Sequence, residues 1–287
     1  MKSRISLYPQ SVFQPAPSEQ FRETVEGGQK LDVTVHGNLD SDRVIVNCLP
    51  WSEYTLRPDA NARYGIMARA ADAVVVSVDN PGVGAHGSRL SRRLRADLRD
   101  GNGDQFAMMQ HEALQHVAER VGLYIANSAL YGYSQGTIMA MKLAPLLKPK
   151  SLILSEPVGV DPIAPKDLVR AFLADGKRDT QYKAENPRWF QDITRLQFPP
   201  QPATLLASVQ MMSRGGYFAS GLDVQGIKKT IVYGAESTVC TTENVDNLSR
   251  QLKGAEIIEL ENENHSILNS VGRMAVLFEE LRRSHRL

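Results

Sequence analysis

The chain has 287 residues, of which 42% are hydrophobic and 23% are charged, and its formal net charge is +1. This composition is typical of a globular protein that buries a sizeable core, as one large domain or as a domain with an insertion. The near-zero net charge argues against nucleic acid or an anionic membrane surface as the main partner.

The N-terminal segment and the cysteines predict a cytoplasmic protein. The segment MKSRISLYPQSVFQPAP contains no continuous apolar stretch, so we expect no signal peptide, and no apolar run is long enough to span a membrane. Cys48 and Cys240 have neither disulfide-framework nor metal-ligand spacing, and we expect reduced thiols. The sequence leaves open whether the protein forms a homo-oligomer.

Short apolar segments alternate with helical patterns along the chain. We expect strands at 29–36, 43–48, 73–79, 128–134, 151–156, 230–235 and 256–260, and helices at about 59–70, 105–121, 136–147, 242–252 and 267–283. The segment 88–100 carries five arginines, while its leucines recur every four residues, so we expect an amphipathic helix with a solvated basic face. The alternation predicts an α/β fold with a mostly parallel central sheet flanked by helices.

One interval interrupts this alternation. More than 70 residues separate the strand ending at Glu156 from the strand starting near Thr230, whereas loops in such units usually have about 2–6 residues. We expect residues 157–225 to form a helical cap over one end of the sheet, inserted into a core made of 1–156 and 226–287. The interval has helical patterns at 167–174 and 203–214 and many large apolar side chains, which either pack the cap or line a pocket: Phe172, Trp189, Phe190, Phe198, Met211, Met212, Tyr217 and Phe218.

A glycine-flanked serine lies between the strand at 128–134 and the helix that follows. The stretch Gly132-Tyr133-Ser134-Gln135-Gly136 has the form G-x-S-x-G at a strand-to-helix junction, which is the context that this motif requires. A sharp turn there would expose the Ser134 hydroxyl at the sheet edge, and the amides of the helix N-terminus would suit a developing negative charge. Ser134 is therefore a candidate nucleophile, which needs a base, an acid and oxyanion donors.

Three further segments extend this motif into a family resemblance. VDNPGVGAHGS at 78–88 looks like an Asp-x-x-Gly-x-Gly-x-Ser loop, NCLPW at 47–51 follows an earlier strand, and ENENHS at 261–266 follows the last one. Over roughly residues 20–285 the chain resembles the α/β-hydrolase superfamily. The resemblance implies that fold and a nucleophile, acid and histidine in this chain order.

The position of His265 makes it the candidate base. Only His265 and His285 follow Ser134 in the sequence. His285 lies among arginines near the C-terminal end, whereas His265 directly follows a predicted strand and should emerge at the same sheet edge as Ser134. The resemblance places the family's histidine there as well.

The acid departs from the pattern of similar hydrolases, which usually carry an aspartate where this chain has Ser237. Glu236, one residue earlier, is one candidate. Glu156, at the end of the strand after the nucleophile helix, is the other, and some relatives place their acid there. Both strands should end at the same edge, so both carboxylates could reach His265, and Asp246 and Glu263 stay open as further alternatives.

The resemblance implies that backbone amides form an oxyanion hole. One should belong to Gln135, after the nucleophile, and the second to the LPWS stretch, for which we choose Trp51 with Leu49 and Ser52 as alternatives. Pro50 has no amide hydrogen to donate. Trp51 could instead be a wall of an acyl pocket or part of the core.

These residues predict a serine hydrolase that acts on a small-molecule ester, thioester or similar acyl substrate. Neither metal-ligand spacing nor a nucleotide-binding loop occurs, so we expect no cofactor and no metal. One alternative is an enzyme of the same fold that cleaves C–C bonds or lactones or acts as a perhydrolase. Another is a non-catalytic hydrolase-fold protein that binds a ligand under its cap.

Overall fold

The computed structural model describes residues 2–7, 14–51, 53–87, 89–176, 202–215, 224 and 226–287. These residues form a nine-stranded sheet with the order β1-β9-β8-β7-β6-β4-β5-β3-β2. β3 pairs antiparallel with β2 and β5, and the other neighbours pair parallel. The strands are β1 (Lys2–Ser6), β2 (Ser18–Val25), β3 (Gln29–His36), β4 (Val44–Cys48), β5 (Val74–Val78), β6 (Ala129–Tyr133), β7 (Ser151–Ser155), β8 (Lys228–Gly234) and β9 (Glu256–Glu261).

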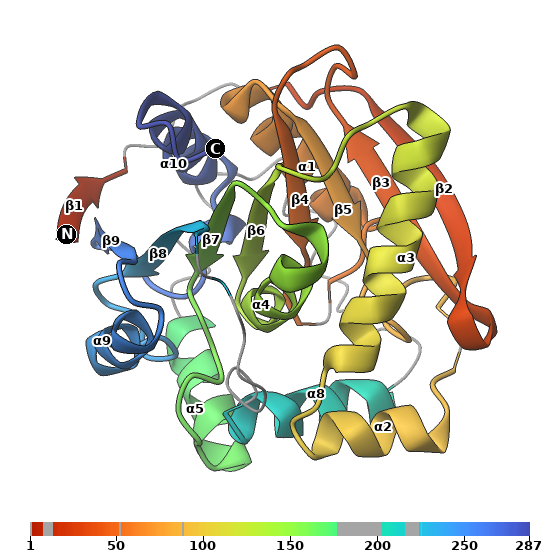
Figure 1. Ribbon diagram of the computed structural model, residues 1–287. Helices are drawn as coiled ribbons and strands as arrows, with labels where there is room; N and C mark the ends of the chain where they lie inside the picture. The colour runs from red at the N-terminus through yellow and green to blue at the C-terminus, as the bar shows by residue number, and fades with distance from the viewer. Residues whose placement is uncertain are drawn as a thin grey trace.

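Helices cover both faces of the sheet, which confirms the predicted fold class (Figure 1). The helices are α1 (Pro58–Ala71), α2 (Arg92–Arg99), α3 (Asp104–Val121), α4 (Gln135–Leu147), α5 (Pro165–Gly176), α8 (Pro202–Ser213), α9 (Thr242–Gln251) and α10 (Val271–Arg283), with 3-10 turns at Glu26–Gly28 and Ile267–Asn269. One apolar cluster joins one face to α3, α4 and α9, and a second joins the other face to α1 and α10. None of the helices that the structure describes is long and apolar enough to cross a membrane.

The strands divide their side chains between these clusters because successive residues point to opposite faces. In β4, Val46 and Cys48 join the α3/α4 side, whereas Ile45 joins the α1/α10 side. Tyr131 of β6 meets Phe278 of α10 edge to face, with ring centroids 5.0 Å apart. Because both sheet faces are covered, the central strands are mostly apolar, as their sequences predicted, and the buried Asn47 of β4 donates to Ser77 of β5.

The two edge strands β1 and β2 were not predicted. β1 pairs parallel with β9, and Lys2 and Arg4 both lie 2.6 Å from the carboxylate of Glu259. β2 pairs with β3 through a tight turn in which Gly27 and Gly28 have φ of 72° and 71°. Neither strand has a sustained apolar pattern, since each is bordered by only one other strand and is largely exposed.

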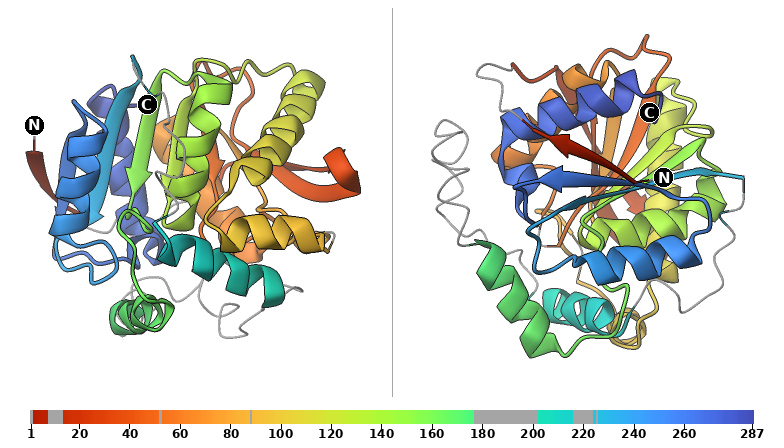
Figure 2. Two further views of the ribbon diagram at one scale, coloured as in Figure 1. Left: turned by 60° about the horizontal axis from the view of Figure 1, so that its bottom comes forward. Right: turned by 90° about the vertical axis from the view of Figure 1, so that its left-hand side faces the viewer.

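Three helices lie at the edge of the sheet where the parallel strands end. α2, α5 and α8 cross this edge together, and α8 runs beside α2 (Figures 1 and 2). Of the predicted cap at 157–225, the structure describes 157–176, 202–215 and 224. Met211 and Met212 are fully buried in the same apolar cluster as α4. Trp189, Phe190, Phe198, Tyr217 and Phe218 lie outside the described residues.

Glycines bring the N-terminus of α4 into backbone contact with the ends of β4 and β6. A Cβ atom added at Gly136 would lie 2.9 Å from the Leu49 carbonyl oxygen and closer still to that of Cys48. One added at Gly132 would lie 2.7 Å from Thr137 Cα. Because these neighbours are backbone atoms, the two outer positions of the G-x-S-x-G motif exclude every side chain.

We therefore expect Gly136→Ala to lower the free energy of unfolding by about 3 kcal/mol, because a Cβ forced against carbonyl oxygens must displace the backbone. Urea unfolding measures this loss. Gly176→Ala, at the end of α5, is the matched control, because a Cβ there has no neighbour within 4 Å, and its effect should stay within about 0.5 kcal/mol. Equal effects of the two substitutions would contradict the packing argument.

Candidate active site

Ser134 lies at the junction of β6 and α4 in a backbone conformation that few non-glycine residues adopt. Its φ is 54° and its ψ is −124°, and it is the N-cap residue of α4. Its amide donates to the Ser155 carbonyl (3.0 Å), and its own carbonyl accepts from the amide and hydroxyl of Thr137 (3.0 and 2.5 Å). A strained backbone of this kind persists only where the surrounding contacts hold it in place. At Ser134 it turns the side chain toward the sheet edge.

His265 brings its imidazole to Ser134 from the loop after β9. Nε2 lies 3.0 Å from Ser134 Oγ, and Nδ1 lies 3.0 Å from Glu156 Oε2. A carboxylate only accepts hydrogen bonds, so Nδ1 carries the proton and donates it, which leaves Nε2 to accept from the serine hydroxyl. This is the hydrogen-bond order that a general base for Ser134 requires.

Glu156 directly follows β7 and is completely buried. Its φ of 52° turns the side chain toward His265. Oε1 accepts from the Gly234 amide (2.5 Å), and Oε2 accepts from the Ser237 hydroxyl (2.7 Å) as well as from His265. Three donors thus hold a carboxylate that burial would otherwise destabilise.

The other three acidic candidates lie elsewhere. Glu236 is solvent-exposed on the loop after β8, where its amide donates to the Glu263 carbonyl. Asp246 is exposed on α9, and the buried Glu263 carboxylate pairs with Arg273. Of the two glutamates that the sequence left open, Glu156 is therefore the one whose carboxylate the structure brings to His265.

Two aromatic side chains contact the imidazole of His265. The Tyr133 ring stacks on it with centroids 5.5 Å apart and an angle of 26°, and the Tyr133 hydroxyl donates to the His265 carbonyl. Phe172 of α5 meets the ring edge to face at 5.1 Å. In the sequence, Tyr133 occupies a variable position of the G-x-S-x-G motif and Phe172 lies in the predicted cap, and nothing in their local patterns indicates this contact.

The two expected oxyanion donors are Gln135, directly after Ser134, and Trp51, on the loop after β4. Gln135 occupies the first helical position of α4, where a backbone amide has no intrahelical acceptor. Trp51 follows β4 on a neighbouring loop, and its indole Nε1 donates to the Leu205 carbonyl of α8 (3.3 Å). Its ring stacks on Phe172 with centroids 6.2 Å apart. The Trp51 side chain thus joins the loop to α5 and α8, while the loop backbone at Leu49 runs past α4.

Residues after β5 hold the loop after β4 in place. Asp79 Oδ1 accepts from the Thr55 amide (2.7 Å), and Asn80 Nδ2 donates to the Leu49 carbonyl (3.2 Å). Gln110 of α3 supports both residues, since its amide donates to the Asp79 carbonyl and to Asn80 Oδ1. These contacts tie the start of the VDNPGVGAHGS segment to the loop after β4.

A buried ionic network anchors the same loop to α1. Arg63 contacts both carboxylate oxygens of Glu53 (3.0 and 2.9 Å), and Tyr64 donates to Glu53 as well (2.7 Å). Burial opposes the charge of Arg63, but Glu53 and Asp59 outweigh it and raise the pKa of the guanidinium. Both partners of the Arg63–Glu53 pair are over nine-tenths buried, so removing Arg63 would leave the Glu53 charge uncompensated.

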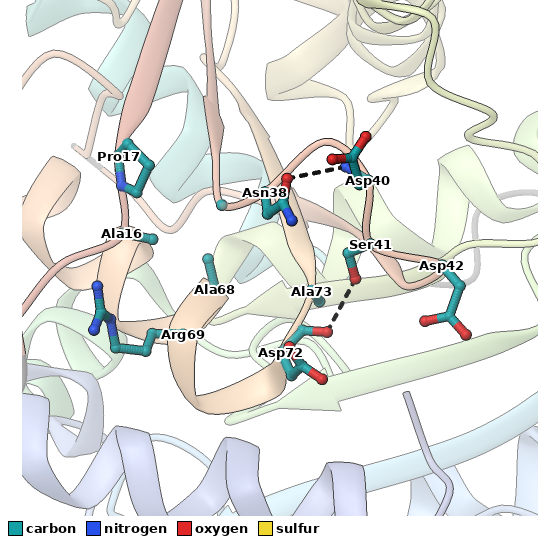
Figure 3. Close-up of a pocket in the computed structure, with 11 residues that line it drawn as sticks. Ala16, Pro17, Asn38, Asp40, Ser41, Asp42, Ala68, Arg69, Asp72 and Ala73 are labelled. Carbon is teal, nitrogen blue, oxygen red and sulfur yellow. Dashed lines mark hydrogen bonds between the residues drawn. The ribbon is translucent and has the colours of Figure 1, made fainter.

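A surface pocket of about 440 Å³ lies at the opposite edge of the sheet (Figure 3). The loop after β3 and the end of α1 line it, with Asp40, Ser41 and Asp72 around its rim. This pocket contains none of the candidate site residues. Within the described parts of the chain, no three His, Cys, Asp or Glu side chains gather as metal ligands would.

Comparison with known proteins agrees with the fold. A model of the alpha/beta hydrolase family matches residues 33–277. The chain matches none of the curated proteins with which it was compared.

Solved structures of several enzymes share the fold. The 2-hydroxy-6-oxo-6-phenylhexa-2,4-dienoate hydrolase of Rhodococcus sp. strain RHA1 is 19% identical with a TM-score of 0.62, covering 94% of this chain and all of its own. The thioesterase domain from the curacin biosynthetic pathway is 16% identical (TM-score 0.58; 91% and 99% covered). A Pyrobaculum calidifontis esterase is 14% identical (TM-score 0.59; 95% and 86% covered).

The buried carboxyl of Asp79 should make the stability of the protein depend on pH. Desolvation raises the pKa of its carboxyl to about 8, and Oδ2 has no hydrogen-bond partner among the described residues. Between about pH 4 and pH 8 the folded protein keeps this proton while the unfolded chain releases it, so the contribution of Asp79 to stability falls as pH rises through that window. Below and above the window its contribution is constant.

We expect the Asp79→Asn variant to lack this pH-dependent contribution to stability. The stability of the wild type minus that of the variant, measured by urea unfolding from pH 4 to pH 9, should fall by on the order of a few kcal/mol. The carboxamide oxygen of the variant can still accept from the Thr55 amide, so the loop contact survives. A flat difference curve would show that Asp79 titrates normally.

Proposed function

Because the chain belongs to the alpha/beta hydrolase family, we propose that it is a serine hydrolase that cleaves a carboxylic ester or a related acyl bond through an acyl-enzyme on Ser134. The observation that carries this proposal is the pair of 3.0 Å contacts that joins Ser134 Oγ, His265 and Glu156. The positive φ of Ser134 adds support, because a strained backbone of this kind persists only where the surrounding packing holds it in place.

The proposed reaction uses groups of this chain only. Ser134 Oγ attacks the acyl carbon while its proton passes to His265 Nε2, and Glu156 stabilises the imidazolium through Nδ1. The amides of Gln135 and Trp51 donate to the oxyanion. The protonated histidine then gives its proton to the leaving group, and water, deprotonated by the same nitrogen, releases the acid and restores the serine.

We further propose that residues 157–225 form a cap that bounds the substrate site. Phe172 of α5 and the Leu205 carbonyl of α8 both contact Trp51, and Phe172 also contacts His265. Ser134 and His265 are 3% and 6% exposed, so a substrate must enter beneath the covering helices. The acyl group would then lie among apolar and aromatic side chains.

Two alternatives use the same site differently. The same groups could cleave a C–C bond or a lactone, since fold likeness alone does not select a bond type. A non-catalytic ligand-binding protein would leave the Ser134 hydroxyl unreactive. Labelling with a fluorophosphonate probe separates this last candidate from both enzymes, because only an activated serine reacts.

The first test is the hydrolysis of 4-nitrophenyl esters of increasing acyl length. We expect the wild type to turn over and Ser134→Ala to lose at least about 10⁴-fold in kcat, since the nucleophile is gone. The fluorophosphonate probe should label the wild type and not the variant. A wild type that neither hydrolyses any ester nor takes the label would refute the proposal.

The acid is tested by a matched pair of glutamine variants. Glu156→Gln should lower kcat by about 10³–10⁴-fold, because a carboxamide neither fixes the histidine tautomer nor stabilises the imidazolium. Glu236→Gln, on the exposed loop, should retain kcat to within about twofold. The reverse ranking in the same ester assay would assign the acid to Glu236.

A further inference from the structure

A buried carboxylate that contacts the backbone of His265 has no part in the proposed reaction. Asp175 lies near the end of α5 and is 3% exposed. Its carboxylate accepts from the His265 amide (3.2 Å), the Thr238 amide (3.1 Å) and the Thr238 hydroxyl (2.6 Å). Its own carbonyl accepts from Asn264 Nδ2 (3.1 Å). One residue of a covering helix thus ties together the loops after β8 and β9.

These bonds exist only while α5 lies on the sheet edge. A buried carboxylate is stable where several donors replace its water shell, and hydrogen bonds to a charged acceptor are the strong ones. Removing the carboxylate would also leave the His265 and Thr238 amides unsatisfied in a buried setting, which costs as much as the lost bonds themselves. The helix and the two loops therefore hold one another.

The same network reaches the acid. The Ser237 hydroxyl lies 2.7 Å from Glu156 Oε2 and 3.4 Å from Asp175 Oδ2, and it accepts from the Cys240 amide (3.0 Å). The shorter contact indicates that it donates to Glu156. Ser237 and Thr238 are consecutive, so the loop that Asp175 clamps is also the loop that supports Glu156.

We propose that Asp175 is a positioning residue that couples the docking of α5 to the placement of His265. It acts on the backbone of His265 and touches neither the imidazole nor the reacting atoms. This inference rests on the proposed hydrolase function, because its consequence is that the Ser134–His265–Glu156 chain is complete only while α5 is docked.

Asp175→Asn in the full-length protein is the direct test, since the carboxamide keeps the size but has a single acceptor oxygen for at least three donors. A misplacement of His265 should lower kcat for 4-nitrophenyl esters by about 10–100-fold with KM within about threefold. Amide hydrogen exchange at Thr238 and His265 should accelerate at least about tenfold, while amides of the central strands keep their protection.

Two further variants control this test. Asp167→Asn changes a partly exposed aspartate of the same helix that pairs with Arg170, and it should leave kcat, KM and exchange unchanged. Thr238→Val removes the 2.6 Å hydroxyl contact with Asp175 and the 3.0 Å contact with the Ala171 carbonyl, both of which join the loop after β8 to α5. It keeps the Thr238 and His265 amide bonds to Asp175, so it should accelerate exchange at Thr238 with a smaller loss of kcat. If Asp175→Asn does not fold, Thr238→Val still tests the link.

The outcomes are distinct. Unchanged kcat or unchanged exchange of both amides in folded Asp175→Asn would overturn the proposal, and a raised KM at constant kcat would replace positioning by a role in substrate binding. A wild type that is inert toward esters and the fluorophosphonate probe refutes the hydrolase function instead. The exchange measurement still decides in that case whether Asp175 holds the His265 loop.

Discussion

The site depends on the close backbone contact between the start of α4 and the ends of β4 and β6. Gly132 and Gly136 permit this contact because each faces backbone atoms where a Cβ would be. The contact leaves no room for a relaxed turn, so Ser134 takes a φ of 54°. The same packing sets the first amide of α4 beside the loop that carries Trp51. The strain at Ser134 and the close approach of α4 to the loop after β4 thus have one cause.

Around this contact, buried polar groups hold loops that would otherwise be free. Asp79 and Asn80 bind the loop after β4 from one side, and the Arg63–Glu53 pair binds it from the other. These groups carry a desolvation cost, visible in the raised pKa of Asp79. Well-packed apolar side chains would often stabilise a protein as well as such a network. Hydrogen bonds and ion pairs are directional, however, so they fix the orientation of the loop backbone. A backbone amide that donates to an oxyanion needs such a fixed orientation.

The two glutamates considered as the acid for His265 follow two neighbouring parallel strands. β7 and β8 end at the same edge, so residues after either could face His265. Chain direction at these two loops decides between them. Glu156 has a left-handed backbone that turns its side chain under His265, whereas Glu236 follows Gly234 on a loop that points to solvent. Ser237 then contributes a hydroxyl to Glu156.

The sequence by itself determined the alternation of elements, the mostly parallel sheet and the positions of Ser134 and His265 at the ends of strands. These features follow from local patterns, namely buried β-branched runs, helical spacing and a glycine-flanked serine, which act over a few residues. Strands β1 and β2 could not be predicted from such patterns. The edge strand β1, for example, is held by its pairing with β9 and by the ion pairs of Lys2 and Arg4 with Glu259.

Only the tertiary structure decided which carboxylate meets His265, and which side chains surround that histidine. Tyr133, Phe172 and Asp175 reach His265 from a strand and a covering helix that lie far from it in the sequence. Contacts of this kind depend on side-chain direction and on the docking of whole elements. No local pattern encodes them, because the same residues in another packing would be ordinary core or surface positions.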